Sequence, residues 1–378
     1  MMKDVIINSV PCTTWNWLKM NKDVMSLEAS FEEITPKISD LQKGITVSSA
    51  KDAPNAFTQI ASGICNVATP KAKDNRRQDG TFFEKSELKT TSSNAAEHPV
   101  QKLIDEVIPN PQLITIEGKQ NTPVVLNFDF TKPSVASQYI YAKENSEATV
   151  IIVMKGNAPA SVIQTRIYAE DYAKIHIAKV QLMDDSTTLL DDTGFYCCDN
   201  ANAQFTQIEL GGLHNDSGLN VTLNGYQSNF KSHVAYLCTD NQFLDMNHIV
   251  NHYGKKTECD MQVNGTLKGN AVKTYRGTID FKNGCSGSKG NEMEESLVLS
   301  PKVVNKSLPN ILCDEEDVEG EHGATIGRLA SDILFYMQSR GISEEEAEKL
   351  MSRAKIQAAA DLIPDEKTRD LITEYLDK

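Results

Sequence analysis

The sequence of 378 residues predicts a mainly β fold with flanking helices, in which short strands stack into a β-helix or another solenoid. Three features carry this prediction: apolar and polar residues that alternate, glycine-containing turns, and a weak internal repeat. We expect a helical or irregular N-terminal domain at 1–110, a β-helix core at 111–313 and a C-terminal helical domain at 314–378.

The central region contains short stretches that alternate apolar and polar residues, such as Val124–Phe130 and Thr278–Phe281. Turn signals punctuate it at Gly211-Gly212, Asn224-Gly225, Asn264-Gly265 and Asn283-Gly284. No proline occurs from Ala160 to Leu299. Because proline cannot donate to a hydrogen-bond ladder, this absence favours extensive paired β-structure.

The repeat places a small residue ahead of alternating apolar positions at Ala148, Ala173 and Ala203, with offsets of 25 and 30 residues. Spacing of this size suits one coil of a stacked-strand solenoid. A β-sandwich stays open as the alternative, because periodicity alone does not exclude it.

The N-terminal region shows helix-like spacing around Trp15, Leu18 and Met25, and again in His98–Ile108. Between them, residues 69–97 are polar and are expected to form a surface segment.

The C-terminal region predicts three helices. The first runs from Ser331 to Arg340 and ends at Gly341, a favoured residue after a helix. Ser343 and Glu346 form a capping box for the second helix, and Pro364 opens the third.

The net charge of -14, from 38 basic and 52 acidic residues without a basic stripe, argues against nucleic acid or an anionic membrane as partner. No apolar run approaches the ~20 residues of a membrane span, and no secretory signal is read at the N-terminus. The eight cysteines show no C-x-x-C spacing, so reduced thiols and a cytoplasmic protein are expected.

Common catalytic motifs are missing: there is no P-loop, no strand followed by G-x-G-x-x-G, and no G-x-S-x-G elbow. Two acidic pairs, Asp184-Asp185 and Asp191-Asp192, raise the alternative of a β-helix carbohydrate-active enzyme, which needs two carboxylates several Å apart. Adjacent residues of a strand point to opposite faces, so solvated turns are the favoured interpretation of both pairs.

His248 and His252 could share one strand face, but no third metal ligand is evident near them.

His322 follows an acidic run, with six acids among the eight residues from Asp314 to Glu321. Imidazole and carboxylates are reasonable ligands for iron. From composition and spacing alone, a histidine that orders a domain junction is the favoured interpretation.

At this point the sequence resembles the SufB/SufD family of iron–sulfur cluster assembly proteins. The residues that carry the resemblance are Ser296–Pro301, Asp317-Val318, His322–Leu329, Leu334–Tyr336 and Ser339–Ile342, with Tyr275–Gly277 and Thr14–Lys19 further upstream. The H-G-A-T-I-G-R-L and S-R-G-I stretches are the most specific.

The resemblance implies a right-handed parallel β-helix with helical segments at both ends. It also implies a non-catalytic subunit of the SufBCD scaffold complex. A SufC-type ATPase would then dock on the C-terminal helices through Leu334, Phe335, Tyr336, Arg340 and Gly341, and a SufB-like subunit would pair with the β-helix. A homodimer in isolation, or a homodimeric adaptor without metal chemistry, stays open.

The family's conserved SufD histidine falls on His322. The resemblance therefore implies that His322, with Glu321, contributes to an iron–sulfur cluster or iron held transiently and only with the SufB-like partner; none is expected in the isolated chain. SufB-type proteins carry a cysteine just before the stretch that corresponds to Ser296–Pro301, and Glu294 stands nearest its place. The resemblance therefore makes Glu294 a third candidate metal ligand, while the missing cysteine favours SufD over SufB. Glu321 in turn matches the SufB pattern.

Overall fold

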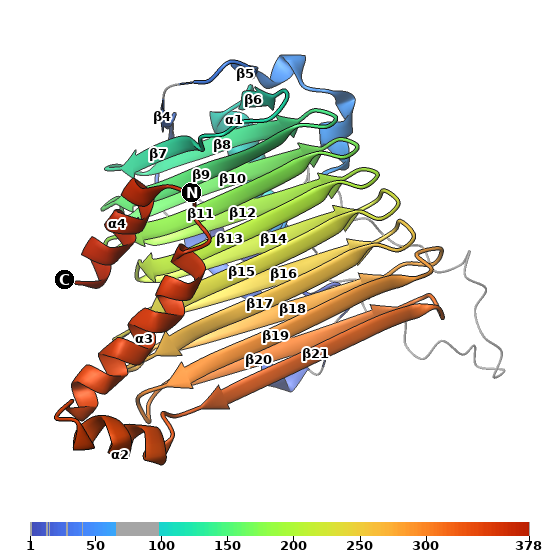
Figure 1. Cartoon of the computed structure of the whole chain (residues 1–378). Coiled ribbons are helices and arrows are strands. Elements are labelled where there is room, and N and C mark those ends of the chain that lie inside the picture. Colours follow the sequence, from blue (N-terminus) through green and yellow to red (C-terminus); the bar gives the residue numbers. More distant parts are fainter. Residues whose placement is uncertain are drawn as a thin grey trace.

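The computed structural model describes residues 2–12, 14, 16–27, 29–39, 41–65 and 98–377. Within them the chain forms a two-sided solenoid, in which each coil gives one strand to each of two facing sheets (Figure 1). Neighbouring strands within each sheet of the solenoid pair in parallel, coil upon coil. The predicted solenoid is thus confirmed, and the sandwich alternative is wrong.

The even sheet consists of β6 (Gln112–Ile116), β8 (Ser134–Ala142), β10 (Ala160–Ala169), β12 (Thr188–Cys197), β14 (His214–Leu223), β16 (Phe243–His252), β18 (Val272–Phe281) and β20 (Val304–Cys313). The odd sheet consists of β7 (Val124–Phe130), β9 (Glu147–Gly156), β11 (Lys174–Met183), β13 (Asn202–Gly211), β15 (Asn229–Cys238), β17 (Glu258–Leu267), β19 (Ser288–Val298) and β21 (Val318–Gly327).

The predicted repeat falls on β9, β11 and β13, which are neighbours in the odd sheet. Ala148 pairs with Ile175 rather than with Ala173, and Ile175 pairs with Ala203. The predicted alignment is therefore displaced by two residues at one strand. A displacement of two keeps each side chain on the same face, which is why the alternation still revealed the repeat.

Three of the four predicted turns lie outside strand interiors, at Gly211-Gly212, Asn224-Gly225 and Asn283-Gly284. The fourth, Asn264-Gly265, is wrong because both residues lie inside β17. A Cβ atom on Gly265 would come within 2.4 Å of the buried Tyr236 ring. This glycine therefore makes room for an aromatic side chain rather than for a turn.

Apolar side chains from both sheets fill the interior, with Phe128, Ile177, Phe205 and Phe281 among the fully buried ones. Each of these is flanked along its strand by residues that point outward, as the period of two requires. The interior thus holds two apolar clusters, one around these residues and a second around Tyr236 and Tyr275, to which successive coils contribute.

The first end of the solenoid is covered by N-terminal strands. β5 (Ile45–Ser49) pairs antiparallel with β6, β4 (Lys37–Ile38) pairs antiparallel with β7, and β3 (Glu32–Glu33) pairs with β8. An antiparallel hairpin of β1 (Met2–Ile7) and β2 (Asp23–Leu27) packs with α1 (Pro99–Val107) on the outer face of the even sheet.

Three short 3-10 helices, Asn16–Leu18, Ala50–Asp52 and Asn55–Gln59, join these N-terminal elements. The helix expected in His98–Ile108 is confirmed as α1. The helix-like spacing near Met25 is wrong, because that residue lies in β2. Trp15 and the polar segment 69–97 lie outside the described residues.

The C-terminal helices are α2 (Ser331–Ser339), α3 (Glu344–Ala360) and α4 (Glu366–Leu376). The capping box of Ser343 and Glu346 is present, and Gly341 adopts a φ of +85° after α2. α3 and α4 cover the outer face of the odd sheet through a shared apolar cluster (Figure 1). None of the described helices is long and apolar enough to span a membrane.

The expected boundary between 313 and 314 cuts through the solenoid, because β21 continues it to Gly327. The residues of β21 are exposed or half-buried on both faces. A strand of this kind lacks the apolar alternation that would reveal it in the sequence. His322 therefore lies inside the last strand of the solenoid rather than at a junction between domains.

Candidate functional site

His322 faces the inside of the solenoid at its open end, which we define as the last coil, β20 and β21. Val318 packs against the interior core, and a Cβ atom on Gly320 would lie 3.0 Å from the Phe281 ring. Side chains alternate along a strand, so His322 points to the same side as these two residues. It is exposed because β21 is the outermost strand of its sheet.

The nearest strand neighbour of His322 is Glu292 of β19, its partner in the parallel register. Glu292 is 1% exposed and one of its carboxylate oxygens lacks a hydrogen-bond partner. Burial, reinforced by the nearby Glu294, raises the pKa of Glu292 to about 8. The open end therefore combines an accessible imidazole with a carboxyl group that is held protonated near neutral pH.

Glu294 also faces the interior and stands opposite Ala324 in the register. It forms a buried ion pair with Lys273, and it accepts hydrogen bonds from the Ser296 hydroxyl at 3.0 Å and from Ser307. Its two oxygens are thus already engaged within the chain. This arrangement is typical of a residue that holds a buried cation in place.

Glu321 points to the opposite face of β21 from His322. It lines a shallow outer groove together with Asp260, Lys289 and Asn291. The predicted residues Glu321, His322 and Glu294 are therefore not brought together as one ligand set. Within the described residues, the one group of three ligand side chains in mutual reach lies elsewhere, at Asp23, His214 and Asp216.

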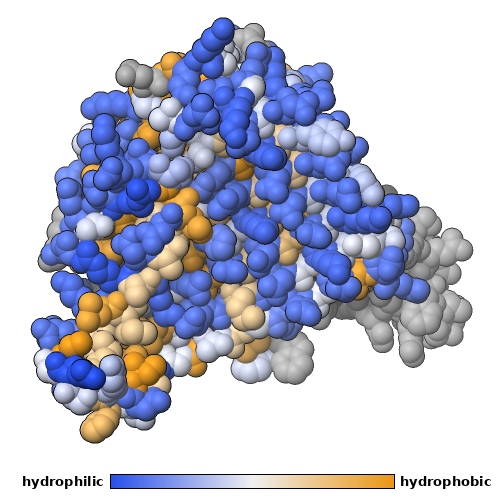
Figure 2. All heavy atoms as spheres, viewed as in Figure 1, coloured by the Kyte–Doolittle hydropathy of each residue, from blue (hydrophilic) through white to orange (hydrophobic). Residues whose placement is uncertain are grey.

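The residues predicted to bind a partner lie on or just after α2, which has no buried residue. Phe335 and Tyr336 are 73% and 60% exposed, and Leu334 is half-buried. The Arg340 guanidinium lies 5.3 Å from the centre of the Tyr336 ring. Figure 2 shows apolar side chains gathered at this lower corner of the molecule, over α2 and the start of α3.

The acids of the carbohydrate-enzyme alternative do not converge. Asp191 points into the solenoid and pairs with Lys179, whereas Asp192 points outward and pairs with Arg166. Both are buried in β12, so the turn predicted for this pair is wrong. The sequence did not predict this burial, because a charged side chain can be buried in a strand only when an opposite charge pairs with it. The sequence alone does not identify those partners.

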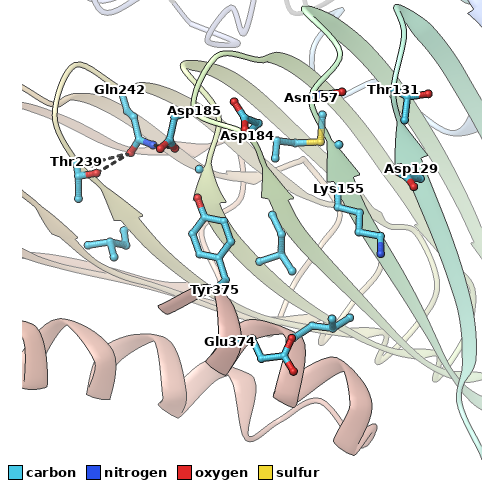
Figure 3. A pocket seen from close by; sticks show the side chains of 16 residues that line it. Asp129, Thr131, Lys155, Asn157, Asp184, Asp185, Thr239, Gln242, Glu374 and Tyr375 are labelled. Atoms are coloured by element: carbon cyan, nitrogen blue, oxygen red, sulfur yellow. Dashed lines mark hydrogen bonds between the residues drawn. The ribbon is translucent and has the colours of Figure 1, made fainter. Parts of the chain in front are cut away.

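Asp184 and Asp185 do lie in a turn, at the edge of a cavity of about 690 Å³ between the odd sheet and α4 (Figure 3). Asp184 accepts hydrogen bonds from the Ser186 backbone and hydroxyl, and Asp185 accepts one from Gln242 at 2.9 Å. Tyr375 of α4 projects toward the two acids (Figure 3). With Asp191 and Asp192 inside separate ion pairs, the four acids form no catalytic pair.

The histidines of β16 belong to no group of three ligand-type side chains among the described residues. His248 is fully buried, and burial lowers its pKa to about 3. His252 is hydrogen-bonded to Thr257 at 2.7 Å and lies 3.3 Å from the Cys259 sulfur. The eight cysteines are all free, as predicted.

Comparison with known proteins decides the family. The SufBD core domain model of the SUF system for iron–sulfur cluster assembly matches residues 129–355, which is more than half of the chain. The chain belongs to the SufBD family. This membership supports a role in iron–sulfur cluster assembly.

Individual relatives are distant. An iron–sulfur cluster assembly SufBD family protein of Synechocystis is 23% identical over 360 residues, covering 85% of this chain and 73% of that protein. The iron–sulfur cluster assembly protein SufD of Bacillus subtilis is 29% identical over 127 residues, covering 34% of this chain and 29% of that protein. SufD of Plasmodium berghei is 24% identical over 245 residues, which is 63% of this chain but 18% of that protein.

Proposed function

We propose that this chain is a SufD-like, non-catalytic subunit of a SufBCD scaffold for iron–sulfur cluster assembly. Its C-terminal helices would bind a SufC-type ATPase, and the open end of its solenoid would bind a SufB-like subunit. The cluster, or iron, would be present transiently and only in the assembled complex, in the cytoplasm. The observation that carries the proposal is the combination of the family match with two uncovered surfaces, the apolar side chains of α2 and the strand edges at the open end.

The first surface is α2. A helix whose large apolar side chains are exposed costs free energy in water unless another molecule covers it. Phe335 and Tyr336 are large and exposed, and aromatic residues often supply most of the binding energy at an interface. The absence of nucleotide motifs in this chain fits a partner that supplies ATP hydrolysis.

The second surface is the open end. In the part of the chain that the structure describes, β20 and β21 each end their sheet, so one edge of each carries backbone groups without a strand partner. Ile326 on β21 is 50% exposed, and it shares the inward face with His322. A second solenoid placed here would cover both edges and bring further ligands to His322.

Binding of a SufC-type ATPase to purified full-length chain tests the first surface. We expect Phe335→Ala to weaken binding by at least about tenfold, as loss of a central aromatic contact does. Tyr253→Ala removes an aromatic ring that is 48% exposed and lies away from these helices, and it should leave the affinity unchanged. Equal affinities for all three proteins would refute docking on α2.

A further inference from the structure

A separate cluster of ligand-type side chains lies where the N-terminal hairpin meets the outer face of the even sheet. Asp23 begins β2, and His214 and Asp216 lie two residues apart on β14, so both point outward. One ligand atom from each of the three lies within 4.8 Å of the others. Strands that are far apart in the sequence thus converge on one point.

The converging atoms have no partners except one another. Asp216 is buried, and no donor from outside the cluster reaches either of its oxygens; Asp23 Oδ2 and His214 Nε2 likewise have no partner outside it. His214 Nε2 lies 3.0 Å from Asp216 Oδ2 and 3.7 Å from Asp23 Oδ2. Two carboxylates face one imidazole here, so even a protonated His214 compensates only one of the two negative charges and leaves the other for a further cation.

Neighbouring positive side chains do not meet this need. Asp245 stands beside Asp216 in the register, and Arg276 pairs with Asp245 and with the Met20 carbonyl. Asn8 donates to Asp245 as well, at 2.9 Å. The charge of Asp245 is therefore compensated by the protein, whereas that of Asp216 faces His214 and a second carboxylate.

We propose that Asp23, His214 and Asp216 bind one divalent transition metal ion, which fastens the N-terminal hairpin to β14. One imidazole nitrogen and two carboxylate groups suit Mn²⁺, Fe²⁺ or Zn²⁺. The His214 and Asp23 side chains are 31% and 21% exposed, so an ion can enter and water can complete its coordination. The Phe243 ring, 4.4 Å from the imidazole centre, restricts the orientation of His214.

The rival arrangement is a protonated His214 held between the two carboxylates without a metal. The two arrangements differ in what they predict for stability. Because an ion that binds only the folded chain stabilises it by mass action, added metal should raise the Tm and slow amide exchange in β1 and β2. A proton on His214 would produce neither effect.

The test uses untagged full-length chain stripped with a chelator and titrated with Mn²⁺, the free ion being counted by electron paramagnetic resonance. Mn²⁺ is the probe because it binds thiolates poorly, and Cys313 is exposed. We expect about one equivalent of Mn²⁺ to bind, and affinity to fall at least about tenfold in Asp216→Asn and His214→Gln. His233→Gln, on the outer face of the odd sheet, is the matched control and should bind like wild type.

Asp23→Asn provides a milder variant if replacement of the buried Asp216 prevents folding. Loss of Mn²⁺ binding in folded Asp23→Asn supports the site. Wild-type chain that binds no stoichiometric Mn²⁺ and shows no Mn²⁺-dependent rise in Tm would overturn it. Unchanged binding in the His214 and Asp23 variants would overturn it equally.

Discussion

At the scale of single residues, the interior of the solenoid depends on charges that neutralise one another. Lys273 and Glu294 are both buried and paired. We expect Glu294→Gln to lower the free energy of unfolding by about 3–5 kcal/mol, because it leaves Lys273 buried without its partner. Urea denaturation measures this loss.

The double variant Lys273→Met/Glu294→Gln serves as the control for that prediction. It removes both charges and should recover most of the stability lost in the single variant. A single variant as stable as wild type would show that the pair does not hold the interior together.

Two buried carboxyl groups should make stability depend on pH. Burial raises the pKa of Glu292 and of Glu209 to about 8, from an ordinary value of 4.5. Between about pH 4.5 and pH 8 the folded chain retains protons that the unfolded chain releases, so the free energy of unfolding should fall as pH rises. Each group contributes a slope on the order of 1 kcal/mol per pH unit.

Glu292→Gln, which cannot ionise, should flatten that decline, whereas Glu321→Gln on the exposed outer face should leave it unchanged. Urea denaturation at several pH values between 5 and 8 gives the comparison. This range lies between the ordinary pKa of the carboxyl group in the unfolded chain and its raised pKa in the folded chain. Identical slopes in wild type and Glu292→Gln would mean that Glu292 is not held protonated.

Predictions for single residues succeeded where a local sequence motif identifies the residue. They failed where the surroundings of the residue depend on a partner far away in the sequence. His322 could be singled out from its motif, but Glu292 was missed. Glu292 lies two residues before Glu294 on the same strand, so both side chains are on one face. Only the pairing of β19 with β21 brings Glu292 beside His322. The burial of Asp191 and Asp192 likewise depends on Lys179 and Arg166, which lie on other strands.

At the scale of elements, α3 is held to the odd sheet by an apolar stripe. Ile356 is fully buried in the cluster that α3 and α4 share with the sheet. We expect Ile356→Ala to cost about 2–5 kcal/mol of unfolding free energy through loss of apolar burial and the cavity it leaves. Leu350→Ala on the same helix, at a position 49% exposed, should cost much less. Thermal denaturation of the two variants separates these outcomes; equal costs would contradict the observed packing.

Elements with local signals were the easiest to predict. The capping box of α3 and the glycine after α2 are encoded within a few residues. β21 was not predicted, because an outermost strand has no covering layer to impose apolar alternation. The short strands β3, β4 and β5 were also missed, since they are defined by pairing with coils far along the chain.

At the scale of the whole molecule, the solenoid is closed at one end and open at the other. N-terminal strands cover the first coil, whereas β20 and β21 leave their outer edges without a strand partner within the described residues. α2 lies beside this open end (Figure 1), and its Phe335 and Tyr336 are exposed. Two surfaces that need covering therefore lie at one end of the molecule, which supports the proposal of a subunit with two partners.

The most direct test is anaerobic cluster reconstitution on the complex of this chain with a SufC-type ATPase and a SufB-like subunit, with iron and sulfide measured per complex. We expect wild-type complex to accumulate both, and His322→Ala to form the same complex while retaining little of either. His233→Ala, distant from the open end, should behave like wild type. Failure of the wild-type chain to join either partner, or full cluster content in the His322→Ala complex, would contradict the proposed role.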